Sequence, residues 1–241
     1  MTVRINVWSS PRNLSTAMMY SWSQRADTTV IDEPLYAHYL SHTGRVHPGT
    51  QEIIGSQDCD GAAVVEKVLL VDYTTPIVFF KQMAKHLVGL DRSFLSAGPN
   101  VLLTREPRDM LSSLQVQLPD LTIADTGFVE LCSILQSVLD AGEQPIVVET
   151  KSLLRDPQRV LATLCERVGV AFDDAMLSWP KGPKPQDGVW APHWYHRVWE
   201  STGWEPYVEK DIELSEAAAL VLPNAERAYE QLLPYQIGTA P

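Results

Sequence analysis

The residues best suited to do chemistry lie near the start of the chain. An apolar run over residues 3–8 ends in the sequence SSPRNLST, residues 9–16, and an amphipathic segment follows at once. The N–H groups at the start of a helix lack backbone partners, and the helix dipole adds partial positive charge there. Arg12 adds a full charge, and Ser15 and Thr16 add hydroxyl groups. The pattern predicts a strand, a loop and a helix, with an anion bound in the loop.

The loop differs from the Walker A sequence GxxxxGK[ST], which binds nucleotide phosphates. It contains no glycine, and Arg12 stands where a lysine is usual. Because residues other than glycine disfavour positive φ angles, Leu14 restricts the backbone here; the loop can still bind an anion if every residue keeps φ negative, as at an ordinary helix start. ATP is therefore not the first ligand that this loop suggests.

The length and composition of the chain narrow the choice of protein class. With 241 residues, of which 45% are hydrophobic, the chain can build one sizeable α/β domain. A formal net charge of −11 argues against nucleic acid as a partner, and no apolar run is long enough to span a membrane. Cys59, Cys132 and Cys165 lack metal-binding spacing and are typical of reduced thiols. We expect a cytoplasmic monomer or homodimer.

Apolar runs alternate with helical patterns along most of the chain. Runs at 28–32, 76–81, 100–105 and 145–149 predict four further strands. Apolar residues at helical spacing cover 61–73 and 126–141, and Pro107 and Pro157 suit the first positions of two more helices. Because strands that alternate with helices form parallel sheets covered on both faces, we expect an α/β fold with about five parallel strands flanked by helices.

Polar side chains follow the end of each predicted strand. In an open parallel sheet, ligands bind beyond the carboxyl ends of the strands, so these side chains should lie along one edge. They are Ser9 to Arg12, Asp32 with Glu33, Lys81, Arg105 and Glu149. Three cations and the anion loop would meet there beside at least one carboxylate. The simplest ligand for this edge is a multiply anionic nucleotide.

The pattern changes after residue 172. Residues 179–207 are rich in proline, tryptophan and glycine, and their large aromatic side chains predict an ordered cap loop over the sheet. Trp190, Trp194, Tyr195 and Trp199 can form a small core there or line the pocket of a ring-bearing substrate. Residues 215–233 predict a terminal helix. We expect one domain over 1–241, with a nucleotide-binding core at 1–172 and the cap and terminal helix at 173–241.

Three segments together resemble sulfotransferases that use 3′-phosphoadenosine 5′-phosphosulfate (PAPS). The loop SSPRNLST resembles the family's 5′-phosphosulfate loop, P-[KR]-S-G-[ST]-T: Pro11, Arg12, Ser15 and Thr16 match, while Asn13 and Leu14 replace Ser and Gly. The segment VLLTREPRDMLSSL resembles the 3′-phosphate motif R-x-P-x-D-x-x-x-S, with Arg105, Pro107, Asp109 and Ser113. The stretch ETKSLLRDPQRVLATLCERVGVAF resembles the family segment after the fifth strand. The resemblance covers residues 4–172.

The resemblance implies a P-loop-type fold in a single sulfotransferase-like domain. It implies transfer of a sulfuryl group from PAPS to a hydroxyl or amine of a small or medium acceptor, with adenosine 3′,5′-bisphosphate as the product. Residues 11–16 would bind the 5′ side of the donor, and Arg105 and Ser113 would read the 3′-phosphate. Lys81 matches a lysine common in the family and would stabilise the bridging oxygen. No metal is expected, because a sulfuryl group carries less charge than a phosphoryl dianion.

Glu33 is the leading candidate for the base that deprotonates the acceptor. It follows the second strand, where several branches of the family place a catalytic glutamate. The other common base, a histidine two residues after the lysine, is absent because Met83 stands there. His86 is the alternative. Lys181 and Lys184 lie where the family often has a basic loop that touches the 3′-phosphate, although a solvated loop is an equal interpretation.

Two other functions remain open. No pattern in the sequence identifies the acceptor. An ATP-dependent small-molecule kinase would need a magnesium site. A catalytically degenerate nucleotide-binding module would hold the bisphosphate without chemistry. The cap segment WPKGPKPQDGVW…HWY…STG resembles a sulfotransferase-like branch that also occurs fused to aminotransferase-like domains.

Overall fold

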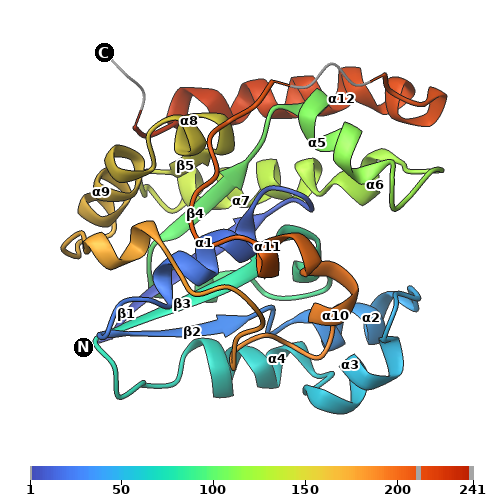
Figure 1. Cartoon of the computed structure of the whole chain (residues 1–241). Helices are drawn as coiled ribbons and strands as arrows, with labels where there is room; N and C mark the ends of the chain where they lie inside the picture. The colour runs from blue at the N-terminus through green and yellow to red at the C-terminus, as the bar shows by residue number, and fades with distance from the viewer. Residues whose placement is uncertain (1, 210–212, 239–241) are drawn as a thin grey trace.

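The computed structural model of the chain describes residues 2–209 and 213–238. Residue 1 of the predicted core (1–172), and residues 210–212 and 239–241 of the predicted cap and terminal helix (173–241), lie outside the described residues. The sheet has five strands, all parallel, in the order β2-β3-β1-β4-β5 (Figure 1). They are β1 (Val3–Ser9), β2 (Thr28–Asp32), β3 (Ile77–Met83), β4 (Asn100–Thr104) and β5 (Ile146–Glu149). The predicted α/β fold is confirmed.

Both faces of the sheet are covered, because successive residues of each strand enter two different cores. In β3, Phe79 packs into one hydrophobic cluster and Phe80 into the other. The first cluster includes residues of α1 (Ser15–Trp22), α2 (Tyr36–Thr43), α3 (Thr50–Ser56), α8 (Thr150–Arg155), α9 (Pro157–Arg167) and the cap. The second includes α4 (Gly61–Val64), α5 (Pro107–Leu114), α7 (Phe128–Asp140) and α12 (Glu216–Leu232). Burial on both faces explains why the strands read as continuous apolar runs.

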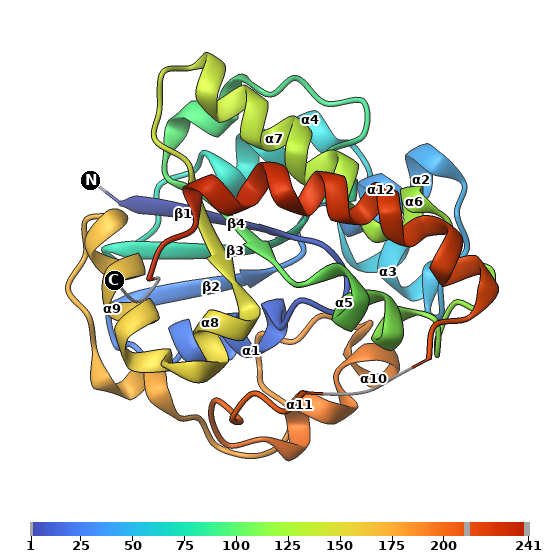
Figure 2. The same cartoon turned by 90° about the horizontal axis from the view of Figure 1, so that it is seen from above.

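The cap and the terminal helix lie on opposite faces of the sheet. Two short helices, α10 (Ala191–Trp194) and α11 (His196–Glu200), form within the predicted cap loop. Trp190 and Tyr195 are buried on the side of α1, whereas α12 packs against α5 and α7. Figure 2 shows α7 and α12 on one side of the sheet and α1 with α10 and α11 on the other. The cap is therefore an ordered layer, as its aromatic residues predict.

Two predicted helices differ from those observed. The helix expected over 61–73 runs as α4 and then as a π-helical turn that ends at Leu69. The helix expected over 126–141 is divided at Gly127 into α6 (Ile123–Thr126) and α7. Gly127 has a φ of 72°, and a Cβ there would lie 3.3 Å from Ser10 Oγ. The positive φ and the close approach of the anion loop both favour glycine at this junction. Among the described residues, none of the helices combines the length and apolar character needed to cross a bilayer.

Three residues other than glycine have positive φ angles in the described part of the chain, and all lie at the carboxyl edge of the sheet. They are Arg12 at 64°, Leu14 at 63° and Glu33 at 39°. The loop therefore does not keep φ negative throughout, as an ordinary helix start would: Arg12 and Leu14 are left-handed. Left-handed residues in a short loop turn its N–H groups toward a common point, which makes a concavity suited to an anion. Such strained positions cluster at functional sites.

The left-handed conformation of Leu14 predicts an unusual order of stability among its variants. β-Branched residues are strongly disfavoured at positive φ, whereas glycine adopts it freely. We expect Leu14→Val to lower the free energy of unfolding by about 1–2 kcal/mol more than Leu14→Gly does. Urea denaturation of both variants measures the difference. If side-chain packing dominated instead, Leu14→Val would be the more stable of the two, which would contradict the backbone explanation.

Candidate active site

The anion loop is anchored to the sheet through Asn13. This side chain is fully buried, and its Nδ2 donates a hydrogen bond to the carbonyl oxygen of Leu103 in β4, at 3.1 Å. Leu14 forms the N-cap of α1 without a side-chain hydrogen bond to the first turn. The helix ladder begins at Met18, whose N–H donates to Leu14. The earlier N–H groups of α1 are therefore available to a ligand at this end of the helix.

The loop is joined directly to the segment that follows β4. Arg12 Nε donates to Ser113 Oγ at 2.9 Å, and Arg105 Nη1 donates to the carbonyl oxygen of Arg12 at 3.0 Å. Ser112 instead bonds to Asp109 within its own helix. The structure thus brings the predicted 5′ and 3′ binding residues into contact, and Ser113 rather than Ser112 faces the loop.

Positive charge is concentrated around these two arginines. Burial lowers the pKa of Arg12, and the nearby charges of Arg105 and Arg197 lower it further. Burial and Arg197 likewise lower the pKa of Arg105, although Asp109, with Oδ2 3.8 Å from Arg105 Nη2, raises it. Three guanidinium groups that repel one another provide a site that an anion would stabilise. Sequence reasoning missed Arg197, since it lies in the aromatic cap outside any motif.

The residues of the loop fit a phosphate or sulfate ester. Two buried oxygen atoms in and beside the loop, Ser10 Oγ and Asn13 Oδ1, have no hydrogen-bond partner among the described residues. The side chains of Ser15 and Thr16 are half-buried at the start of α1. The hydroxyls of Ser15 and Thr16, the free N–H groups and Arg12 supply donors of the kind that bind anions at helix starts.

A second group of charged residues lies buried between β2, β3 and the cap. Lys81, whose side chain is 1% exposed, donates to Asp32 Oδ1 at 2.9 Å, to Glu33 Oε1, and to the hydroxyl of Tyr195 at 2.6 Å. Lys81 lies two residues before the end of β3 and pairs with Asp32 in the sheet. Its ammonium therefore points beneath the cap instead of extending into solvent.

The two buried carboxylates and the single ammonium control one another's protonation. Burial raises the pKa of Glu33, and the adjacent charge of Asp32 adds to this, outweighing the opposite effect of Lys81. Burial alone would lower the pKa of Lys81, but Asp32 and Glu33 together raise it. Lys81 therefore stays charged, while Glu33 has the raised proton affinity that suits a general base.

Both candidate bases lie side by side. His86 is stacked between the rings of Tyr36 and Tyr39, with ring centroids 4.8 Å away on each side. Its Nδ1 is buried, has no hydrogen-bond partner among the described residues, and lies 3.9 Å from Glu33 Oε2. Burial lowers the pKa of His86 well below its ordinary value, so the imidazole is neutral.

The remaining residues singled out from the sequence have structural partners elsewhere. Lys181 pairs with Glu200 at 2.6 Å, and Lys184 donates to the carbonyl oxygen of Pro180 at 2.6 Å. Glu149 caps α8 by accepting from the N–H of Ser152 at 2.8 Å. No group of three or more His, Cys, Asp or Glu residues within 2–209 and 213–238 is arranged to hold a metal ion.

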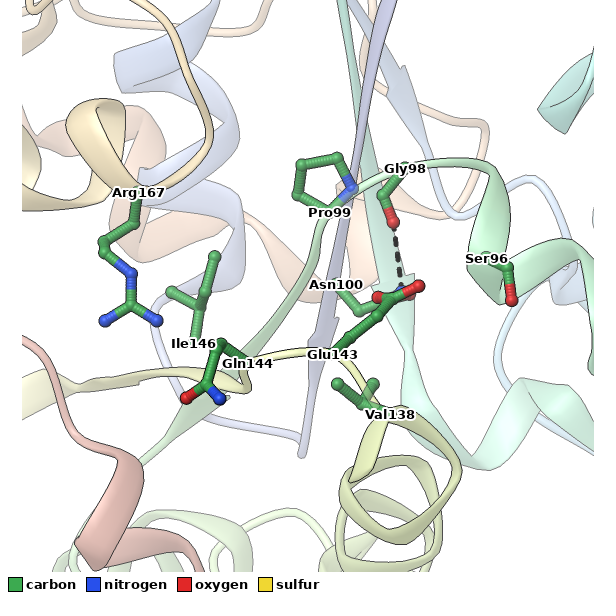
Figure 3. A pocket seen from close by; sticks show the side chains of 9 residues that line it. All are labelled: Ser96, Gly98, Pro99, Asn100, Val138, Glu143, Gln144, Ile146 and Arg167. Carbon is green, nitrogen blue, oxygen red and sulfur yellow. Dashed lines mark hydrogen bonds between the residues drawn. The ribbon is translucent and has the colours of Figure 1, made fainter. Parts of the chain in front are cut away.

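A separate hollow lies at the other end of the sheet, where β4 and β5 begin. It has a volume of about 350 Å³ (Figure 3). Asn100 and Ile146, the first residues of these strands, line it together with Glu143 and Arg167. The residues of the anion loop and of the Lys81 group do not line it, so it is distinct from the candidate active site.

Comparisons with known proteins agree with the family resemblance found in the sequence. The family model described as "Sulfotransferase domain" matches residues 3–223. Branched-chain-amino-acid aminotransferase-like proteins 1 and 2 of Arabidopsis thaliana are 40% and 38% identical over 200 residues, 83% of this chain. That region is 36% of each plant protein, so the chain spans about a third of their length.

Two solved structures share the fold at low identity. A sulfotransferase from Alicyclobacillus acidocaldarius has a TM-score of 0.57 at 12% identity, covering 97% of this chain and 96% of its own. The sulfotransferase domain of the olefin synthase from Synechococcus PCC 7002 has a TM-score of 0.51 at 14% identity, covering 93% and 95%. With the family model extending over nearly all of its length, the chain belongs to the sulfotransferase domain family.

Proposed function

We propose that this chain transfers a sulfuryl group from PAPS to a hydroxyl or amine of a small or medium acceptor, leaving adenosine 3′,5′-bisphosphate. Membership of the sulfotransferase domain family supports sulfuryl transfer. The contact between the anion loop and the segment after β4, through Arg12, Arg105 and Ser113, is the observation that supports this donor. A donor with phosphate groups at both ends of its ribose matches two anion-binding segments held together in this way.

The donor would be held by residues on both sides of that contact. The loop, residues 11–16, and the free N–H groups of α1 would bind the 5′-phosphosulfate. Arg105 and Ser113 would bind the 3′-phosphate, and Arg197 adds positive charge from the cap. Positioning and charge stabilisation by such donors are the main contributions to transfer of this kind. We propose no metal ion, because the sulfuryl group has less charge to neutralise than a phosphoryl dianion.

Glu33 would remove the proton of the acceptor. As the acceptor oxygen or nitrogen forms its bond to sulfur, the bond between sulfur and the 5′-phosphate oxygen breaks, and its electron pair leaves with the bisphosphate. Glu33 Oε receives the acceptor proton, and Lys81 holds the carboxylate in place. Contact of Lys81 with the bridging oxygen stays a prediction, because the structure shows its hydrogens donated to Asp32, Glu33 and Tyr195.

Arg105 should distinguish the bisphosphate from AMP. Arg105→Ala removes a charged donor for the 3′-phosphate, so we expect the affinity for adenosine 3′,5′-bisphosphate to fall about 10- to 100-fold. The affinity for AMP should change far less. Calorimetric titration of each ligand measures both, with Arg108→Ala as the control, since Arg108 is exposed in the first turn of α5, just after Arg105. Equal losses for the two ligands would contradict a 3′-phosphate contact.

Replacement of the two candidate bases should separate their roles. Glu33→Gln cannot accept the proton, so we expect turnover to fall at least about 100-fold, with bisphosphate affinity within a few-fold of the original. His86→Gln should lose much less. Transfer of the labelled sulfuryl group from PAPS to a panel of phenols, alcohols and amines measures turnover. The opposite ranking would make His86 the base.

The pH dependence of turnover should also identify Glu33 as the base. A base must be deprotonated to act, so kcat/KM should rise as the pH rises through the pKa of Glu33. Because burial raises that pKa, the rise should occur above the range of an ordinary glutamate. Glu33→Gln should remove this acidic limb from the residual activity.

A further inference from the structure

The hydroxyl of Tyr195 lies at the centre of a hydrogen-bond network that joins the cap to β2 and β3. It is 2.6 Å from Lys81 Nζ and 2.7 Å from Asp32 Oδ2. Trp190 Nε1 donates to the same hydroxyl at 3.0 Å, and the N–H of Gly188 donates to Asp32 Oδ2 at 3.1 Å. Gly188 and Tyr195 of the cap therefore contact the buried pair of Asp32 and Lys81 directly, and Trp190 supports Tyr195.

Every hydrogen of this network has an acceptor. An ammonium group has three N–H donors, and those of Lys81 go to Asp32, Glu33 and Tyr195. The Tyr195 oxygen accepts from Lys81 and from Trp190 Nε1, so its single proton goes to Asp32. Removal of this hydroxyl would leave donors of Lys81 and Trp190 without partners in a buried site, where unsatisfied groups are costly.

The charged groups around Glu33 explain how the Tyr195 hydroxyl affects its ionisation. The titratable groups that face Glu33 are Asp32 from β2, Tyr36 from α2, Lys81 from β3, Lys85 and His86 from the turn after β3, and Tyr195 from the cap. His86 is neutral, so Lys81 is the only charged group bonded to both buried carboxylates among the described residues. The hydrogen bond that Tyr195 donates to Asp32 offsets part of the negative charge of Asp32, which competes with Glu33 for Lys81. Lys81 can then stabilise the charged form of Glu33 more fully.

We propose that Tyr195 is a positioning residue for the sulfuryl transfer proposed above: its hydroxyl, brought in by the cap, satisfies Lys81 and Asp32 and thereby holds the Glu33 carboxylate ionised and oriented toward the acceptor. The same packing of the cap that buries Tyr195 thus also prepares Glu33 to act as the base. Tyr195 needs no contact with either substrate to act in this way. The cap is then part of the catalytic apparatus as well as a cover.

The test compares Tyr195→Phe with Tyr20→Phe. Tyr20 also anchors the cap, through a hydrogen bond from its hydroxyl to Asp187 at 2.7 Å, but it does not contact Lys81. NMR titration of carboxyl-labelled glutamate, assigned with Glu33→Gln, follows the ionisation of Glu33 directly. We expect Tyr195→Phe to move the titration of Glu33 to higher pH and to lower kcat about tenfold with little change in KM. Tyr20→Phe should leave the titration unchanged.

Each outcome of these experiments either supports or overturns the positioning role of Tyr195. Equal Glu33 titrations in the two variants, or equal losses of kcat without a titration shift, would overturn the positioning role and leave only general loosening of the cap. If Tyr195→Phe fails to fold, fluorotyrosine at position 195 keeps the ring and makes the hydroxyl a stronger donor, so the Glu33 titration should move to lower pH; no shift would overturn the inference. The titration is independent of sulfuryl transfer, so an original protein that transfers no sulfuryl group would contradict the proposed function alone.

Discussion

The buried ammonium of Lys81 is the interaction on which the acceptor side of the candidate active site depends. It is the one positive charge bonded, within the described part of the chain, to both Asp32 and Glu33, and it also binds the hydroxyl of Tyr195. A charge buried this deeply is stable only when its partners are well placed. Two adjacent strands and the cap must therefore come together in one arrangement, and that arrangement sets the position of Glu33.

The carboxyl edge of the sheet divides its charges between two regions. Around the anion loop, Arg12, Arg105 and Arg197 repel one another and favour a bound anion. Beneath the cap, two carboxylates share one ammonium, and burial, together with the charge of Asp32, raises the pKa of Glu33 and favours uptake of a proton. A reaction in which a bisphosphate leaves from one region while a proton enters the other fits this division. Both regions are built at strand ends, where parallel sheets bind ligands.

Much of this arrangement follows from the sequence, and what does not follow has identifiable physical causes. Apolar runs predict the five strands, and the resemblance implies that the loop and Ser113 bind one donor; in the structure Arg12 and Ser113, 101 residues apart, are in direct contact. Periodicity reports burial, but it does not tell which buried polar atoms pair. The contacts of Lys81 with Tyr195, and the approach of Arg197 to the loop, depend on how the cap folds back over the sheet. The left-handed angles of Arg12 and Leu14 escape prediction because their residue types favour other conformations.

The proposed donor is tested most directly by calorimetric titration of the unmodified protein with adenosine 3′,5′-bisphosphate, with AMP, and with ATP plus magnesium. We expect micromolar binding of the bisphosphate without added metal, with a preference of at least about tenfold over AMP, which corresponds to about 1.4 kcal/mol. Preference for ATP with magnesium would contradict this donor and favour a kinase. Binding of none of the three would point to a domain that has lost its nucleotide.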